Sequence, residues 1–199
     1  GNHGNLVGGF LWRDGSYGWA VRLNGVDAYV SLGAEKFDDL TEGTIEAWVY
    51  REEAGRNDAI FAIWRDGDNM FRLYPHSDDH IWYGWRVGGT WYEAHSAMPY
   101  TTGWFHIVAY FGPTTGLKLY FNNELIIDDP TITFGIPDIA PTVEATFGTR
   151  QEYIYPHRGM FTMMRIYDRI LPDEELSIPL MGFQGGRRAE VVWGQDAFN

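Results

Sequence analysis

Hydrophobic and polar side chains alternate along most of the chain. The alternation is clearest in four segments, residues 19–24, 45–50, 104–111 and 117–121. A period of two residues places every second side chain on the same face of an extended strand, so each segment is typical of a strand with one buried face. The pattern predicts a protein built almost entirely of β-strands.

Turn-forming residues separate these segments, among them Asn24-Gly25, Gly88-Gly89 and Asn122-Asn123. One stretch reads as helical, because Pro172 and the acidic residues that follow it suit a first helical turn. Strands joined by short turns are typical of antiparallel sandwiches. We therefore expect an all-β fold, an antiparallel two-sheet β-sandwich of jelly-roll type, with one short helix near residues 172–176.

The chain of 199 residues has the length of one domain, and no linker-like stretch interrupts it before Gly182. We predict a single jelly-roll domain over residues 1–199. Residues 182–199 form either a C-terminal strand or a loose tail. The run of Val191, Val192 and Trp193 favours the strand, because a free tail rarely exposes such apolar residues.

Composition excludes several classes of function. The 9 Trp, 12 Tyr and 12 Phe speak against disorder, and the absence of cysteine removes disulfides, zinc-thiolate sites and thiol nucleophiles. A net charge of −12 repels phosphate backbones and anionic lipid headgroups, so no nucleic-acid partner is expected. No apolar run is long enough to span a bilayer, so no membrane insertion is expected.

Three segments, in this order, resemble a known family. They are Trp19 to Leu32 with Gly43 to Tyr50, Gly103 to Tyr110 with Leu117 to Leu125, and Gly159 to Leu171 with the acidic residues after Pro172. They are similar to segments of laminin-G-like jelly-roll domains in the concanavalin A-like lectin/glucanase superfamily. The resemblance covers residues 6–181 and implies the same sandwich fold. It also brings lectins, glycoside hydrolases and polysaccharide lyases into consideration.

The residues do not match the catalytic patterns of those enzymes. The hydrolases that resemble this fold carry a Glu-x-Asp-x-Glu run, which places two carboxylates on one strand face, and the lyases use a Gln-x-His with Arg and Tyr. Neither run occurs here, and no Gly-x-Ser-x-Gly nucleophile elbow is present. We therefore predict a protein that is not an enzyme.

Calcium is the one candidate cofactor. At a calcium position found in several branches of the superfamily, this chain has Thr162 in place of an acid, so it lacks that carboxylate ligand. The turn containing Asp66 and Asp68 resembles a calcium loop, but Leu73 stands where such a loop has its bidentate glutamate. Asp66 and Asp68 are the candidate metal ligands, and a solvated turn is the alternative.

The richest local signal is a hairpin around Gly88-Gly89. If these glycines are the central residues of a tight turn, Arg86 lies opposite Trp91, Gly84 opposite Glu93, and Trp82 opposite His95. One face is then apolar, and Gly84 leaves a hollow in the other. A turn of another register would exchange the two faces. The side chains expected on the polar face, with two from the preceding strand, are Trp82, Arg86, Trp91, Glu93, His95, Arg72 and Tyr74.

Indole rings beside arginine and glutamate suit a sugar, whose C–H faces lie on aromatic planes and whose hydroxyls pair with planar charged groups. We predict a non-catalytic, lectin-like module that binds a neutral or weakly charged polysaccharide. The alternative is a structural or adhesion component of a phage, virion or other surface assembly, with the same rings buried against partner subunits. Both hypotheses place the protein outside the cell, on a cell surface or in a virion.

Overall fold

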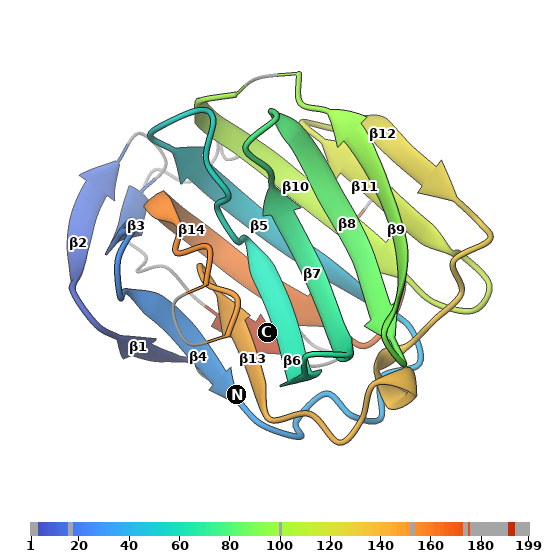
Figure 1. Ribbon diagram of the computed structural model, residues 1–199. Helices are drawn as coiled ribbons and strands as arrows, with labels where there is room; N and C mark the ends of the chain where they lie inside the picture. The colour runs from blue at the N-terminus through green and yellow to red at the C-terminus, as the bar shows by residue number, and fades with distance from the viewer. Residues whose placement is uncertain are drawn as a thin grey trace.

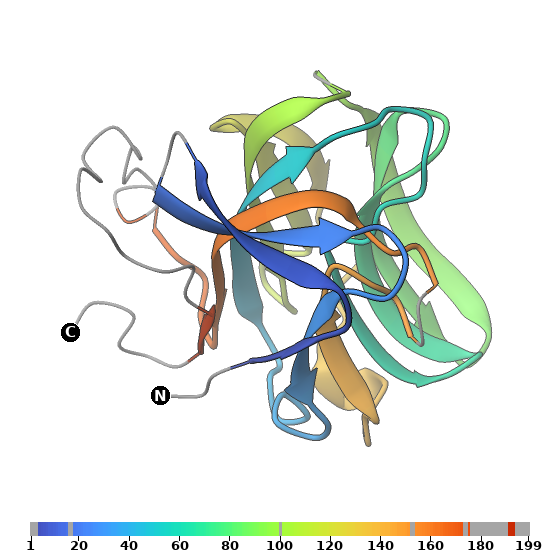
Figure 2. The same ribbon diagram turned by 90° about the vertical axis from the view of Figure 1, so that its left-hand side faces the viewer.

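The computed structural model describes residues 4–15, 18–99, 101–151, 154–172, 175 and 191–193. Two β-sheets pack face to face, as predicted (Figure 1). Figure 2 views both layers from the side of β1 and β2. The predicted helix near residues 172–176 falls mostly outside the described residues. Within the described part, no helix is long and apolar enough to cross a membrane.

The front sheet is the one nearer the viewer in Figure 1. Its strands pair antiparallel, and β9 forms one edge. In spatial order they are β1 (Asn5–Val7), β4 (Tyr29–Gly33), β13 (Glu144–Phe147), β6 (Phe61–Asp66), β7 (Asn69–Pro75), β8 (His80–Val87) and β9 (Thr90–Ala97).

The rear sheet is antiparallel except at β15 (Val191–Trp193), which pairs in parallel with β14. The predicted strand at these three residues is thus present, and the rest of 182–199 lies outside the described residues. The other strands, in spatial order, are β12 (Glu124–Asp129), β11 (Leu117–Phe121), β10 (Gly103–Phe111), β5 (Gly43–Arg51), β14 (Arg158–Tyr167), β3 (Gly18–Asn24) and β2 (Phe10–Gly15). A short 3-10 turn, η1, covers Ile136–Asp138.

The inward faces of the two sheets form the core. Phe71 of β7 lies 4.4 Å from Trp85 of β8 and 5.6 Å from Phe111 of β10, measured between ring centroids. All three side chains are buried. Each square ångström of apolar surface removed from water contributes roughly 25 cal/mol, so these rings hold the two layers together without disulfides.

The β8–β9 hairpin has the register that the sequence predicts. Gly88 and Gly89 both have positive φ, 55° and 83°, which is the conformation that a two-residue hairpin turn needs. Arg86 pairs with Trp91, and every pair toward the open end follows in step. Because the odd-numbered residues of β8 are then directed into the core, the polar set faces outward from the front sheet.

Candidate functional site

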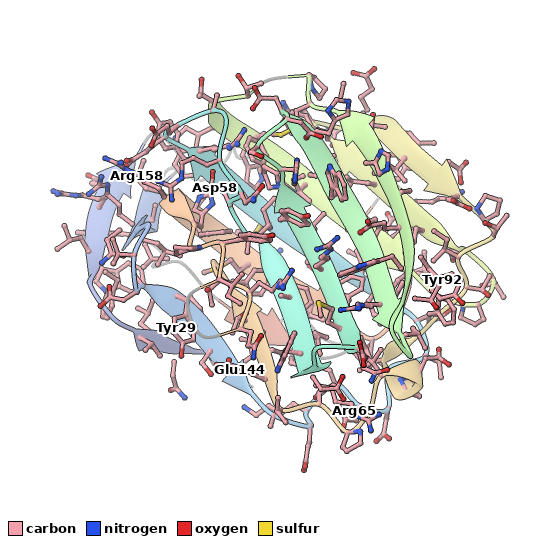
Figure 3. The ribbon with its side chains drawn as sticks, viewed as in Figure 1. Tyr29, Asp58, Arg65, Tyr92, Glu144 and Arg158 are labelled. Carbon is pink, nitrogen blue, oxygen red and sulfur yellow. The ribbon has the colours of Figure 1, made fainter. Side chains whose placement is uncertain are left out.

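All seven residues predicted for ligand binding lie on one surface, the outer face of β7, β8 and β9, which we call the β7–β9 face. The side chains form cross-strand rows, because residues paired in register share a face of the sheet. Figure 3 presents this face to the viewer, between Glu144 on β13 and Tyr92 on β9. The three rows are Met70, Arg86 and Trp91, then Arg72, Gly84 and Glu93, then Tyr74, Trp82 and His95.

Arg72 lies at the centre of the β7–β9 face. Its Nη2 atom lies 2.7 Å from Glu93 Oε2, and its guanidinium carbon lies 3.6 Å from the centroid of the Trp91 ring and 4.9 Å from that of Tyr74. Arg72 is only 6% exposed. The predicted site residues therefore form two layers, with Arg72 and Tyr74 below and Trp91 above.

The hollow expected at Gly84 is absent, which corrects the sequence prediction. A Cβ atom at Gly84 would lie 2.5 Å from the Glu93 Cα atom and 2.4 Å from the Tyr92 carbonyl oxygen. Without a side chain at this position, β9 comes closer to β8 and fills the space. This approach lets Glu93 reach across Gly84 to Arg72. The glycine therefore permits the Arg72–Glu93 ion pair and leaves no cavity.

The two tryptophans of the face differ in accessibility. The Trp82 ring is stacked between two imidazoles, His76 at 4.5 Å and His95 at 4.9 Å. Trp91 is 36% exposed, although Arg72 covers one face of its ring. Its exposure must therefore come from the opposite ring face and the edge. Trp91 can receive a planar or apolar ligand group, whereas Trp82 supports the surface.

Arg86 joins the two hairpin turns beside Trp91. Its Nε atom donates to the carbonyl of Gly89 at 3.2 Å, its Nη1 atom donates to the carbonyl of Gly67, and its Nη2 atom lies 3.3 Å from Asp68 Oδ1. The guanidinium carbon is also 5.3 Å from the Trp91 ring centroid. These contacts fix the turn of β8–β9 against the turn of β6–β7, which gives Trp91 a rigid base.

The candidate calcium ligands take part in the same turn. Asp66 Oδ1 accepts hydrogen bonds from the backbone N–H of Asp68 at 2.8 Å and from Asn69 Nδ2 at 2.9 Å, and these bonds lower the pKa of the Asp66 carboxyl. The guanidinium of Arg86 beside Asp68 opposes a cation. Across the described ranges, no three acidic or histidine side chains gather as metal ligands would. Calcium at Asp66 and Asp68 remains a prediction, and this arrangement does not favour it.

Two loops contribute residues to the β7–β9 face that the sequence did not identify. His76 follows β7 and stacks on Trp82, while Tyr155 stacks on Tyr74 at 5.3 Å between ring centroids. The guanidinium carbon of Arg150 lies 5.1 Å from the Tyr155 ring centroid. Burial under these groups raises the pKa of Tyr74 to about 12. No periodic pattern marks loop residues, so only tertiary structure brings them to the face.

Residues 24–177 match the family described as the concanavalin A-like lectin/glucanases superfamily. No curated protein matches the chain at a significant level. Among solved structures, the CBM40 module of the Ruminococcus gnavus IT-sialidase superposes with a TM-score of 0.62 at 19% identity, covering 83% of this chain and 96% of that one.

Two further structures are similar in fold. Domain 4 of AbnA, a GH43 extracellular arabinanase from Geobacillus stearothermophilus solved with arabinotriose, has a TM-score of 0.60 at 20% identity, covering 80% of this chain and 75% of that one. A mutant NanB sialidase from Streptococcus pneumoniae has a TM-score of 0.64 at 16% identity, covering 80% of this chain and 27% of that one. At these identities the likeness establishes the shared fold.

Proposed function

The chain belongs to the concanavalin A-like lectin/glucanase superfamily, and from that premise we propose that it is a non-catalytic carbohydrate-binding module with its site on the β7–β9 face around Trp91. Two neighbours support a glycan as ligand. The R. gnavus CBM40 module has also been solved bound to α2,3 sialyllactose, and the AbnA domain was solved with arabinotriose. Both have this sandwich fold.

The observation that carries the proposal is the placement of Trp91. Its ring rests on Arg72 and remains 36% exposed, so an aromatic platform is held open to solvent. The C–H face of a sugar ring packs on such a platform. Glu93 and His95 follow on the same side of β9, where they can pair with sugar hydroxyls.

The platform is also rigid before any ligand arrives. Glu93 holds Arg72 at 2.7 Å, and Arg72 in turn supports the Trp91 ring. A site whose side chains are already ordered loses less conformational entropy on binding, which raises affinity for a given set of contacts. Arg72, Tyr74 and Trp82 therefore act as supporting residues, and Trp91, Glu93, His95 and Arg86 act as contact residues.

The partners of Glu93 and Glu46 support a binding role without catalysis. Glycoside hydrolysis uses two carboxyl groups that face one another across the scissile bond. Glu93 is committed to Arg72, and Glu46 is buried on the rear sheet with His106 and Tyr167. Neither is a free acid in an open cleft. We place the module outside the cell or on a cell surface, where polysaccharides are presented to a protein.

The proposal is tested by titrating a panel of oligosaccharides against the protein by calorimetry and tryptophan fluorescence. Trp91→Ala should weaken binding at least about tenfold, equivalent to roughly 1.4 kcal/mol. Trp12→Ala is the matched control, because Trp12 on β2 has a similar exposure of 38% but belongs to the rear sheet. The control should bind as the wild type does.

Two results would contradict the proposal. Equal losses in the Trp91 and Trp12 variants would remove the site from the β7–β9 face. Failure of the wild type to bind any glycan, combined with oligomers on size-exclusion chromatography, would favour the structural or adhesion hypothesis, in which partner subunits cover the same rings. Release of shortened or unsaturated sugars during the titration would overturn the non-catalytic assignment.

A further inference from the structure

A row of alternating arginines and rings crosses the outer face of the front sheet. Each guanidinium carbon lies near the centroid of a neighbouring ring, and one ring stacks on another in the middle. From one end to the other, the row consists of Arg86, Trp91, Arg72, Tyr74, Tyr155 and Arg150. The distances between successive members are 5.3, 3.6, 4.9, 5.3 and 5.1 Å.

The arginine at one end of this row differs from the other two. Arg72 is paired with Glu93 and Arg86 with Asp68. Arg150 forms no ion pair with any residue that the structure describes. Its Nε atom, like that of Arg72, is buried without a hydrogen-bond partner among those residues. Among the described residues, the charge of Arg150 therefore has no acidic partner, whereas the other two arginines of the row have one each.

The surroundings make this lone charge unfavourable in the free protein. Burial lowers the pKa of Arg150, and the charges of Arg72 and Arg86 act in the same direction. A guanidinium nonetheless stays protonated in proteins, so Arg150 cannot escape the cost by losing its proton. A partly buried cation beside two others is stabilised by an anion. The described residues do not supply one, although the chain has 27 acidic residues.

We propose that Arg150 binds the carboxylate of an acidic sugar residue, as an extension of the site at Trp91. This inference rests on the proposed function and specifies its ligand class. Arg150 is only partly buried although its Nε atom is buried, so the two Nη atoms are the donors that we assign to a two-point contact with a carboxylate, with Tyr155 beside the guanidinium. Uronic acids and sialic acids both carry that group, so the chemistry they share defines the class.

The proposal revises the neutral or weakly charged ligand expected from composition. The net charge of −12 describes the whole chain and predicts repulsion of anions. The β7–β9 face with its loop residue Arg150 departs from that average, because three arginines converge there and two carboxylates already neutralise two of them. At the short range of a bound ligand, the local arrangement decides the sign of the interaction.

The experiment compares acidic sugars with neutral counterparts of the same skeleton. The probes are an oligogalacturonide against its methyl ester, and 3′-sialyllactose against lactose, each titrated by calorimetry. Wild-type protein should bind one acid at least about tenfold more tightly than its neutral counterpart. Arg150→Gln should abolish that preference and leave the affinity for the neutral counterpart unchanged. The pair that shows the preference identifies the source of the carboxylate.

Arg13→Gln is the matched control, because it makes the same change in net charge at an exposed position of β2 in the rear sheet. It should retain the preference for the acid. An equal loss in both variants would show that only long-range charge matters and would overturn the proposal. Equal binding of acid and neutral sugar by the wild type would also overturn the proposal. If Trp91→Ala weakened that binding, the proposed function would still stand. Absence of binding to all four probes would overturn this proposal, and the oligosaccharide panel described above would then decide the proposed function.

A measurement without ligand provides a second readout. Because no described acid pairs with Arg150, Arg150→Gln should leave the melting temperature unchanged or raise it by a few degrees. Arg72→Gln should lower it, because the partly buried Glu93 would lose its partner. A fall of more than about 5 °C in Arg150→Gln, or failure of that variant to fold, would identify Arg150 as a structural residue and overturn the proposal.

Discussion

The outer faces of the two sheets carry the same kinds of side chain in different settings. On the rear sheet, Glu46 Oε1 lies 3.0 Å from His106 Nε2, and Tyr167 donates its hydroxyl hydrogen to Glu46 Oε2 at 3.0 Å. Trp48 stacks on His106 at 5.0 Å. The front sheet likewise combines tryptophan, histidine, glutamate and arginine, yet Trp91 and His95 there are exposed.

The difference lies in what covers each face. The segment after β14 folds back over the rear sheet, where Thr44 donates to the carbonyl of Arg169, Leu171 donates its N–H to Thr44, and Tyr110 donates to the carbonyl of Leu171. Leu171 packs in one buried cluster with Tyr110 and Tyr167, and Glu46, His106 and Tyr167 are all buried. Similar residue types thus form a buried hydrogen-bonded network on one sheet and an open candidate site on the other, so composition alone cannot identify a binding surface.

The largest expected effect is on the rear face. Glu46→Ala removes the acceptor shared by His106 and Tyr167, so both polar groups stay buried without it. Arg165 Nη1, 3.9 Å from Glu46 Oε2, also loses its counter-charge, so we expect the free energy of unfolding to fall by about 3 kcal/mol, as when one partner of a buried ion pair is removed. Urea denaturation measures the change. The exposed Glu124→Ala on β12 should change it by less than about 0.5 kcal/mol.

Equal stability of the Glu46 and Glu124 variants would contradict this contrast between the two faces, because the rear cluster would then contribute nothing to the free energy of unfolding. Glycan binding gives a second distinction. Under conditions where the Glu46→Ala variant is folded, it should bind oligosaccharides as the wild type does, since the proposed glycan site lies on the opposite sheet. Loss of binding in a folded Glu46 variant would move the site to the rear face.

The next effect concerns the close approach of β8 and β9. Gly84→Ala places a Cβ atom 2.4 Å from the Tyr92 carbonyl oxygen and 2.6 Å from Glu93 Cβ, so the edge strand must move away. We expect a loss of about 2 kcal/mol of stability, typical of overpacking, together with weaker glycan binding, because Glu93 leaves Arg72. Thermal melts and titration calorimetry measure the two effects.

Gly67→Ala is the control for this change, since an added Cβ there meets nothing within 4 Å. It lies in the neighbouring β6–β7 turn and should preserve both stability and binding. If Gly84→Ala behaved like Gly67→Ala, the strands would not need their close approach, and the two-layer arrangement of the β7–β9 face would lose its physical basis.

The sequence predicted the parts of this face that depend on local rules. Alternation and the Gly88-Gly89 turn together determine the register, so the pairing of Arg86 with Trp91 and of Trp82 with His95 followed directly. The prediction of a hollow at Gly84 was wrong, because the absence of a side chain lets a neighbouring strand approach. Pattern reasoning treats each strand as fixed in place and so cannot anticipate that movement.

The contributions of the loops could not be predicted, since they depend on contacts between residues far apart in the chain. His76 covers one face of Trp82, and Arg150 reaches the face only because Tyr155 stacks on Tyr74. The sequence gives no spacing that places these side chains there. As a result, Trp82 and Trp91 looked equivalent in the hairpin pattern, and the structure separates them into a supporting and an exposed ring.

The smallest expected effect concerns His157, which connects the loop of Arg150 and Tyr155 to the rear sheet. Its Nε2 atom lies 3.0 Å from the carbonyl oxygen of Tyr50 in β5, and burial lowers its pKa below the ordinary value of 6.5. Below pH 6.5 the unfolded chain therefore binds a proton that the folded protein does not, so the free energy of unfolding falls as pH falls. Above that pH both states are neutral at this residue and its contribution is constant.

For one proton, the slope cannot exceed about 1.4 kcal/mol per pH unit. His157→Gln keeps an N–H donor for Tyr50 and does not titrate, so urea denaturation at several values between pH 7.5 and 5 should show a shallower loss of stability in the variant. Parallel curves for the two proteins would show that His157 does not respond to acid in the fold. If the prediction holds, acid weakens the attachment of the Arg150 loop, and sugar binding on the front sheet should weaken as the pH falls.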